Sequence, residues 1–248
     1  MVNSSLLNTE EAARFLRVSQ ASVRRWSDSG LLPARRVGRR RERRFAEGDL
    51  LQFLGQASGD PRPTVPAPSA VNIGSASVPL RTHLAPIYGT DVGGLRLTVP
   101  FLADGLRAAQ PCFLVATGAV LERYIRALTE EHGIDLAAAM ERGQLTIVSW
   151  PGATVAEAIA NWEKVFAKAL AGGTTVLRVV GEMACERSMF ASDAEMVTYE
   201  EAYEFMAKRF PVVTLCQYDA REFGGEILLR ALKAHPDLFQ QNLGAFLN

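Results

Sequence analysis

The sequence predicts an α+β protein, in which a small N-terminal domain precedes a larger α/β domain with a mainly parallel sheet. Three observations support this fold class. Residues 1–55 contain two short capped helical patterns joined by a tight turn. Residues 56–81 are rich in proline and show little hydrophobic periodicity, which is typical of a linker. Residues 82–248 alternate apolar β-rich runs with helical patterns, which favours a sheet covered by helices on both faces.

The composition excludes several classes of protein. The 248 residues are 48% hydrophobic, enough to bury a core. No apolar run approaches the roughly 20 residues that span a bilayer, and the first ten residues lack the apolar core of a signal peptide. We therefore expect a cytoplasmic protein without a membrane partner. Cys112, Cys185 and Cys216 are odd in number and widely spaced, which favours reduced thiols over a disulfide framework.

The charge is unevenly distributed, although the net charge is zero. Residues 1–60 hold eleven arginines against seven acidic residues, a net charge of +4. The remainder holds sixteen basic against twenty acidic residues, a net charge of −4. A basic N-terminal domain attached to an acidic body predicts a polyanionic partner for the N-terminal domain alone.

The N-terminal domain begins with two short helices. Asn8 or Thr9 can cap the first, and Glu11 has the capping-box spacing from Asn8. Ser19 caps a second helix over Gln20–Ser29, which a glycine ends. Two short helices joined by a tight turn form a helix-turn-helix, whose second helix enters the DNA major groove.

The second helix and the residues after it carry the basic side chains. On the helix, Val23 and Trp26 can pack inward, whereas Gln20, Arg24 and Arg25 can reach base edges or phosphates. The following segment, 31–45, predicts a hairpin that turns near residues 38–41. Arginines lie at its tip and on its flanks, and the candidate DNA contacts among them are Arg36, Arg39, Arg40 and Arg43.

Two further features complete this domain. Phe45 would anchor the returning strand, and residues 47–54 would form a short supporting helix. A run of arginines is often only a solvated surface or a targeting peptide. Here it follows a capped two-helix unit, which favours double-stranded DNA as the partner.

These motifs resemble the MerR and excisionase-like winged-helix families over about a fifth of the chain. The matching segments are residues 7–13, 18–26, 30–33, 44–45 and 49–50. The resemblance implies that the recognition helix and the wing contact DNA, which gives that role to Ser19, Ser22, Arg24, Arg25, Arg36, Arg39 and Arg43. The chain departs from the MerR pattern in having a proline-rich segment where a long dimerising coiled coil would follow.

The body alternates strands and helices. The predicted strands are His83–Tyr88, Cys112–Thr117, Leu145–Trp150, Thr175–Val180 and Val212–Tyr218. The predicted helices are Gly94–Ala108, Val120–His132, Val155–Ala171, Tyr199–Arg209 and Gly225–His235. This alternation predicts a parallel sheet.

The body lacks the motifs of common enzymes. GxxxxGK[ST], GxGxxG and GxSxG are all absent. The glycine-rich turn over residues 88–94 has no lysine, and it can be a plain tight turn or can receive an anion at a helix N-terminus. His83, His132 and His235 show no metal-like spacing to one another or to the cysteines. The sequence therefore predicts no catalytic residues, no metal and no cofactor.

Polar and aromatic residues gather where the predicted strands end. They are Tyr88, Trp150, Arg178 with Glu182, and Cys216 to Asp219. Ligands of parallel sheets bind at this carboxyl edge. Because Arg178 lies inside an apolar strand, it needs a partner such as Glu182 or Asp219. A structural ion pair explains it as well as a ligand role does, and Trp150 and Tyr218 can equally be core aromatics.

The body resembles the MEDS family, the dichloromethane-dehalogenase repressor-like sensory domains of methanogens and methylotrophs. The segments that carry the resemblance are residues 83–88, 99–106, 181–183, 199–200, 215–219 and 235–236. It implies a RecA/KaiC-like fold without a Walker A loop, and sensing of small organic molecules such as halogenated or one-carbon compounds. The candidate ligand-binding residues are His83, Tyr88, Trp150, Arg178, Glu182, Cys216, Tyr218 and Asp219. One departure is Ala184-Cys185 after residues 181–183, where we would expect an aromatic residue.

The sequence therefore predicts a ligand-responsive DNA-binding regulator that is not an enzyme. Two DNA-binding domains on one operator require a homodimer, for which residues 155–171 and 199–209 offer candidate surfaces. RNA polymerase is a further candidate partner. Two alternatives remain open at this point: a DNA-tethered enzyme or nucleotide-binding module, and a protein-interaction module that senses nothing.

Overall fold

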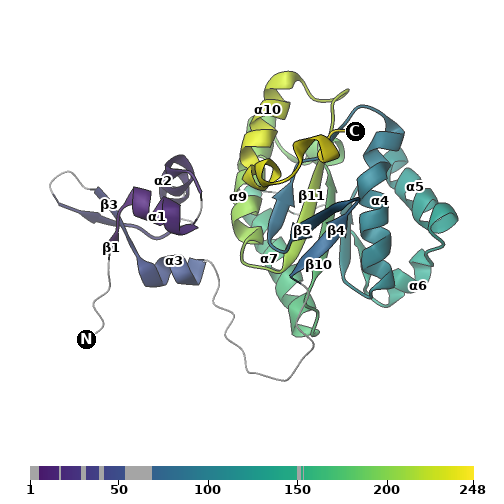
Figure 1. The fold of residues 1–248 in the computed structure, drawn as a ribbon, viewed down its shortest axis with the longest axis horizontal. Helices are drawn as coiled ribbons and strands as arrows, with labels where there is room; N and C mark the ends of the chain where they lie inside the picture. The colour runs from purple at the N-terminus through teal and green to yellow at the C-terminus, as the bar shows by residue number, and fades with distance from the viewer. Residues whose placement is uncertain are drawn as a thin grey trace. The chain divides into compact units, whose positions relative to one another are not determined.

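The computed structural model describes residues 6–16, 18–28, 32–38, 42–53, 69–149, 152 and 154–248. The chain divides into two compact units, residues 1–63 and 64–248, each with its own core (Figure 1). Within the described ranges, no helix combines the length and apolar character needed to cross a membrane.

The N-terminal unit is a helix-turn-helix with a small sheet. Its elements are β1 (Leu6–Leu7), α1 (Thr9–Leu16), α2 (Gln20–Asp28), β2 (Arg35–Val37), β3 (Glu42–Ala46) and α3 (Glu47–Phe53). The strands are antiparallel in the order β1-β3-β2. Val23, Trp26 and Phe45 are buried, as the sequence predicts. The predicted hairpin is therefore present, although its tip at residues 39–41 lies outside the described residues.

Both predicted helix caps are formed. The Asn8 side chain accepts hydrogen bonds from the backbone amides of Glu10 and Glu11 at 2.8 and 2.9 Å. The Glu11 carboxylate in turn accepts from the Asn8 amide at 2.8 Å, which completes a capping box. Ser19 Oγ accepts from the Ser22 amide at 3.1 Å, and this bond fixes the start of α2.

The second unit is built on a parallel sheet in the order β6-β11-β10-β8-β9, and β7 also pairs with β11. The strands are β6 (Thr82–Leu84), β7 (Ile87–Tyr88), β8 (Cys112–Val115), β9 (Leu145–Ile147), β10 (Leu177–Glu182) and β11 (Val212–Asp219). Every pairing in this sheet is parallel. The prediction of a mainly parallel α/β domain is confirmed.

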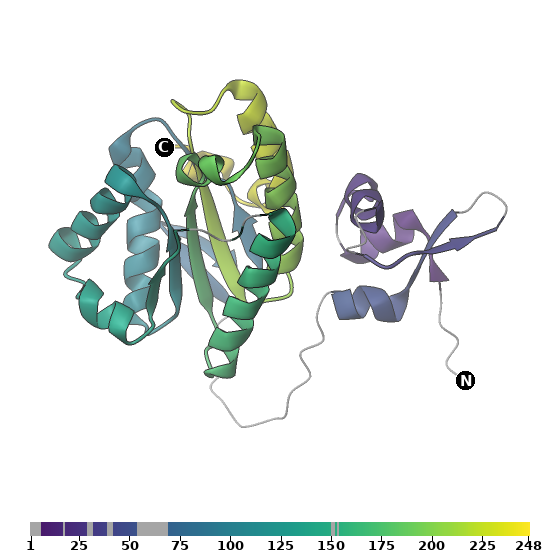
Figure 2. The same cartoon turned by 180° about the vertical axis from the view of Figure 1, so that it is seen from behind.

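Helices cover both faces of this sheet (Figures 1 and 2). The helices are α4 (Asp91–Arg107), α5 (Gly118–Arg126), α6 (Leu136–Glu141), α7 (Val155–Ala171), α8 (Met183–Glu186), α9 (Asp193–Ala207) and α10 (Gly225–Ala234). Four short helical turns add to them: η1 (Ala127–Glu131), η2 (Arg187–Met189), η3 (Pro236–Gln240) and η4 (Leu243–Phe246). Side chains of β8 alternate between the two faces. Phe113 packs in one core with Trp162 of α7, and Leu114 in the other with Leu102 of α4.

Part of the predicted linker is folded. β4 (Ala70–Ile73) and β5 (Ala76–Pro79) form an antiparallel hairpin, and Val71, Ile73 and Val78 are buried in the same core as α4. The assignment of residues 70–79 to a linker is thus corrected. The alternation of apolar and polar residues is only four residues long in each strand, too short to stand out beside the neighbouring prolines.

The predicted helices are confirmed with shifted ends, and α6 and α8 are additional. α9 starts at Asp193 rather than Tyr199, because the Ser192 side chain caps it by accepting from the Glu195 amide at 3.2 Å. α4 starts at Asp91 rather than Gly94, because Thr90 caps it in the same way through Gly93 at 3.0 Å. Both caps extend a helix beyond its hydrophobic periodicity.

A substitution in the β4–β5 hairpin can test whether residues 70–79 belong to the folded core rather than to a linker. Ile73→Ala should lower the free energy of unfolding of the α/β unit by about 2–5 kcal/mol, because the variant leaves a cavity against α4. Urea denaturation followed by circular dichroism measures this loss. Ser77→Ala, at an exposed position of the same hairpin, is the control and should change little. Equal stability of both variants would restore the linker assignment.

Candidate functional site

The predicted DNA-binding residues lie on one helix and one hairpin. Ser19, Gln20, Arg24, Arg25 and Arg36 are exposed, while Ser22 and Arg43 are half-buried. Arg39 and Arg40 lie outside the described residues. The geometry therefore gives α2 a polar, arginine-bearing outer face opposite its buried Val23 and Trp26.

Asp28, the last residue of α2, links the helix to the hairpin. Its carboxylate pairs with Arg43 and lies 3.4 Å from Arg36 Nη2. The two arginines are direct partners in the β2–β3 register, so a single acid contacts both strands. This arrangement fixes the base of the hairpin beside the recognition helix.

The second unit has a pocket of about 590 Å³ at the carboxyl ends of its strands. Its lining residues are Tyr88, Asp91, Thr117, Val120, Arg123, Ala184, Cys185, Ser188, Asp219, Arg221 and Glu222. They come from the ends of β7 and β11, from α4, α5 and α8, and from the connections beside these elements. Tyr88 and Asp219 are the predicted ligand-binding residues in this lining.

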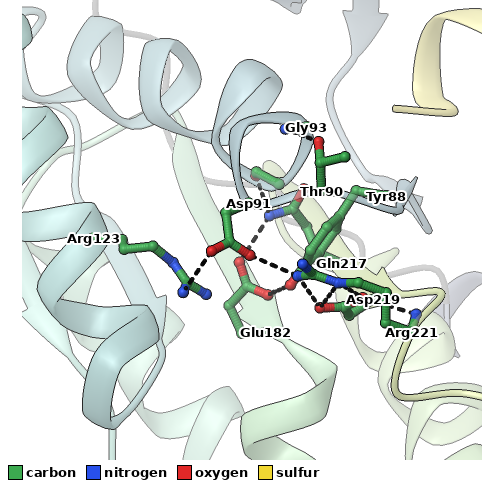
Figure 3. Close-up of polar contacts among 10 residues, drawn as sticks. Tyr88, Thr90, Asp91, Gly93, Arg123, Glu182, Gln217, Asp219 and Arg221 are labelled. Atoms are coloured by element: carbon green, nitrogen blue, oxygen red, sulfur yellow. Dashed lines mark hydrogen bonds and ion pairs between the residues drawn. The ribbon is translucent and has the colours of Figure 1, made fainter.

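A buried hydrogen-bond network forms the floor behind Tyr88 (Figure 3). Glu182 accepts from the Tyr88 hydroxyl at 3.1 Å, from the Tyr124 hydroxyl at 2.6 Å and from Gln217 Nε2 at 2.8 Å. Burial raises the pKa of Glu182 to about 7, although these three hydrogen bonds oppose the shift. The carboxyl group therefore changes its charge near neutral pH.

Four charged side chains form the rim (Figure 3). Arg221 donates to Asp91 at 2.7 Å and to Asp219 at 2.6 Å, and Arg123 donates to Asp91 at 3.1 Å. The hydrogen bond from Arg221 is the main reason why the pKa values of Asp91 and Asp219 are lowered. The rim thus offers fixed donors and acceptors to a polar molecule.

The glycine-rich turn at residues 88–94 is a tight, capped turn. Tyr88 ends β7, and Thr90 caps α4. The backbone of Asn248 lies over the turn, where its carbonyl accepts from the Gly89 amide at 2.7 Å. A Cβ on Gly93 would approach the Asn248 backbone at 3.0 Å. The space above this helix N-terminus is therefore occupied by the chain itself.

Arg178 lies away from the pocket. It is the second residue of β10, at the strand's amino end, whereas Glu182 is the last. Its guanidinium donates to the Gln110 side chain and to the Phe101 carbonyl, both at 2.7 Å, and stacks on the Phe101 ring at 4.7 Å. The predicted pairing with Glu182 or Asp219 is wrong, because four residues of extended strand separate the two ends.

For Tyr218, the sequence left open whether the side chain binds a ligand or belongs to the core. Tyr218 is fully buried, and its ring packs against Phe223 at 5.2 Å, which makes it a core aromatic. Trp150 lies outside the described residues.

Sequence reasoning missed Asp91, Tyr124 and the two rim arginines, Arg123 and Arg221, and it placed Gln217 at the carboxyl edge without assigning it to the ligand site. Arg221 follows Asp219 by two residues, a signal that was available. Arg123 and Tyr124 lie on α5, and their neighbours in sequence give no signal of a role in the site.

His83 and Cys216 lie on the opposite face of the sheet, towards α9. Cys216 Sγ is 3.1 Å from His83 Nε2, and His235 and Glu200 complete a fully buried group. Burial raises the pKa of the Cys216 thiol well above its ordinary value. Burial and the neighbouring His235 lower that of His83. These residues therefore do not line the pocket, although the sequence assigned them to the same site.

Comparisons with known proteins agree with this division. The methanogen/methylotroph, DcmR sensory domain, abbreviated MEDS, matches residues 82–236, and a helix-turn-helix domain matches residues 6–58. The transcriptional repressor DcmR of Methylorubrum extorquens is 37% identical over 247 residues, covering 96% of this chain and 92% of the relative. The chain belongs to the MEDS family. The candidate pocket and the buried histidines both lie within its MEDS domain.

Two solved structures are also similar. The flagellar accessory protein FlaH of Methanocaldococcus jannaschii is 13% identical with a TM-score of 0.44, over 63% of this chain and 69% of that one. A KaiC-like protein of Pyrococcus horikoshii is 16% identical with a TM-score of 0.45, over 57% of this chain and 64% of that one.

The raised pKa of Glu182 predicts a pH dependence of stability. The folded state binds this proton more tightly than the unfolded state, so its stabilising effect is complete below about pH 4.5 and is lost as the pH rises through about 7. Between pH 5 and pH 8 the wild-type chain should lose about 2–3 kcal/mol more of its free energy of unfolding than Glu182→Gln does. Urea denaturation at the two pH values measures the difference, and parallel losses would contradict the assignment.

Proposed function

We propose that this chain is a ligand-responsive transcriptional regulator. Its helix-turn-helix unit binds operator DNA, and the pocket of its MEDS domain binds a small organic effector. The observation that carries the proposal is the presence of two separate binding surfaces on one chain. An arginine-bearing recognition helix lies in one unit, and a pocket of about 590 Å³ with a polar rim lies in the other. The 37% identical relative is a transcriptional repressor, which supports the same function here.

The exposed face of α2 supports DNA binding. Gln20 and Arg24 lie one helical turn apart and contact each other at 3.4 Å, so both side chains point to the same side of the helix. Such side chains contact base edges, while hairpin arginines contact phosphates or the minor groove. We assign the unit to the MerR-like winged-helix type on this arrangement, with Ser19, Ser22, Arg25, Arg36, Arg39, Arg40 and Arg43 as further contacts.

The pocket's chemistry supports a small organic effector. Its volume lies within the roughly 300–1,000 Å³ of small-molecule sites. Val120 and Ala184 supply apolar surface, and Thr117 and Ser188 supply hydroxyl groups. Glu182 behind Tyr88 can donate or accept a proton near neutral pH. Halogenated and one-carbon compounds are the first candidates for the effector.

Regulation requires that the effector bind one arrangement of two DNA-binding units more tightly than another. An effector with equal affinity for both arrangements would not change their populations. We propose a cytoplasmic homodimer that binds a two-fold operator through two such units. The helices α7 and α9 are the candidate dimer surfaces, and of the two α7 has the larger exposed face, because most of α9 is buried within the chain. RNA polymerase is a candidate partner at the promoter, and no catalytic role is proposed.

The DNA-binding role predicts the effect of Arg24→Ala. Loss of a base contact should weaken binding to the chain's own promoter by about 1–3 kcal/mol, with a smaller effect on unrelated DNA. Fluorescence anisotropy across a salt series measures both affinities. Arg142→Ala removes the same charge from an exposed position of the other unit and should leave the affinity unchanged. Equal affinities of Arg24→Ala and the wild type would argue against α2 as the recognition helix.

The sensory role predicts the effect of filling the pocket. In Ala184→Leu, operator binding should persist, but the compound that shifts wild-type binding should lose at least tenfold in potency, because the new side chain occupies its volume. Ala137→Leu, at an exposed position of α6, should respond as the wild type does. A full response of Ala184→Leu would place the effector elsewhere. A wild-type response to nucleotides alone would favour the nucleotide-binding alternative.

A further inference from the structure

Four potential metal ligands meet in the interior of the MEDS domain, on the sheet face that packs against α9. They are His83 of β6, Glu200 of α9, Cys216 of β11 and His235 after α10, and we call them the His–Cys–Glu cluster. One donor atom from each lies within 4.8 Å of the others. The exposed fraction of these residues is 5% for Cys216 and 0% for the rest.

Each imidazole has an oxygen atom from outside the cluster beside the ring nitrogen that points away from the cluster. His235 Nδ1 lies 2.8 Å from the carbonyl oxygen of Ala231, so it carries a proton and leaves Nε2 to face the cluster. His83 Nδ1 lies 3.2 Å from a carboxylate oxygen of Glu204, without hydrogen-bond geometry, and its Nε2 faces the same centre. The contact of His235 is typical of histidines that bind metals, in which the other ring nitrogen donates to a carbonyl or carboxylate.

The atoms that face the centre are electron-rich and poorly matched to one another. The two Nε2 atoms are 3.0 Å apart, and Glu200 Oε2 lies 2.8 Å from that of His235 and 3.5 Å from that of His83. A proton on His235 Nε2 could satisfy only one of these neighbours. Within the described residues, neither oxygen of Glu200 has a hydrogen bond of adequate geometry. An unsatisfied buried carboxylate is costly, so protons alone leave the cluster unbalanced.

We propose that His83, Glu200, Cys216 and His235 bind one four-coordinate transition-metal ion of the zinc type. Two imidazole nitrogens, a thiolate and a carboxylate are a donor set for zinc, whereas magnesium and calcium prefer oxygen alone. The ion's positive charge offsets Glu200 and the thiolate at the place where both are buried. The site is distinct from the effector pocket and does not depend on the proposed function.

The spacing of the donors fits such an ion. Zinc bonds of about 2.0–2.3 Å at tetrahedral angles place neighbouring donor atoms roughly 3.3–3.7 Å apart. Four of the donor pairs are 2.8–3.5 Å apart, and all the donor atoms lie within 4.8 Å of one another, so only small shifts are needed around a central ion. Side-chain rotations supply shifts of this size.

The surroundings complete the site. Glu204, one turn after Glu200 on α9, has one carboxylate oxygen 3.2 Å from His83 Nδ1 and the other 3.2 Å from Lys208 Nζ. Lys208 pairs with Asp237, whose carboxylate accepts a hydrogen bond from the backbone amide of His83 at 2.9 Å. The ion would thus tie four segments that are far apart in sequence. Because the donors are closed to solvent, the ion would enter during folding and would exchange slowly afterwards.

Metal content of the full chain tests the proposal. The protein should be expressed in zinc-supplemented medium and purified without metal-affinity chromatography. Inductively coupled plasma mass spectrometry should then find one equivalent of zinc per chain. Chain expressed in cobalt-supplemented minimal medium should hold cobalt instead. Its spectrum should then show the d–d bands of tetrahedral cobalt and a thiolate-to-cobalt charge-transfer band.

A matched pair of variants locates the ion. Cys216→Ala should lose the charge-transfer band and at least tenfold of the metal affinity. Cys112→Ala, which removes another buried thiol from the same sheet, should keep both. If Cys216→Ala does not fold, His235→Gln and Glu200→Gln provide the same comparison, and the cobalt spectrum of the wild type tests the thiolate ligand without any substitution.

The metal content of the wild type and the variants decides whether the site exists. One equivalent of zinc in the wild type and in Cys112→Ala, together with its loss from the cluster variants, supports the site. Zinc content well below one equivalent after expression with zinc would overturn it. So would cobalt bound without a thiolate band, or metal content that the cluster variants retain.

Discussion

The parallel register of β10 with β11 is the constraint on which both polar sites depend. It pairs Gly181 with Cys216 and Glu182 with Gln217. Because successive side chains of a strand point to opposite faces, Glu182 and Gln217 meet on the α4 face, and Cys216 faces α9 with His83. A slip of one residue would exchange the two faces and separate both groups from their partners. The hydrogen bond between Gln217 and Glu182 therefore also fixes the register.

The MEDS domain buries an unusual amount of acid around these strands. Glu182, Glu186, Glu200 and Glu204 are all nearly inaccessible to solvent. Burial raises the pKa of Glu182, Glu186 and Glu204, which favours their neutral forms. Burial, the largest single cause, acts on the pKa of Glu200 in the same direction, but the neighbouring His235, His83 and Cys216 together outweigh it, and the pKa is lowered. Of these four acids, the one beside the imidazoles is thus the one whose pKa is lowered.

Gly181 shows how tightly these groups are packed. A Cβ at this position would collide with the carboxylate of Glu186. Steric crowding therefore explains why a glycine stands at this position, and the neighbouring residues in the sequence do not reveal that crowding. The glycine leaves room for Glu186, and substitution there would disturb the face of the sheet that holds Cys216.

Sequence reasoning succeeded where the signal is local. The capping box at Asn8, the cap at Ser19 and the alternation of strands and helices all depend on residues a few positions apart, and the structure confirms them. It failed where proximity depends on topology. His83 and His235 are 152 residues apart, and only the adjacency of β6 and β11 brings them together with Cys216. No spacing rule for metal ligands covers such distances.

Arg178 shows why a carboxyl-edge pocket could be predicted although several residues assigned to it, Arg178 among them, lie elsewhere. In β10 a buried cation lies near the amino end and a buried acid at the carboxyl end. The cation is satisfied by neutral acceptors, the Gln110 amide and the Phe101 carbonyl, and its burial lowers its pKa. The acid lies behind Tyr88, which faces the pocket. A charged residue in an apolar strand therefore indicates a binding site only when the strand's direction places it at the carboxyl edge, where the helices begin and leave space for a ligand.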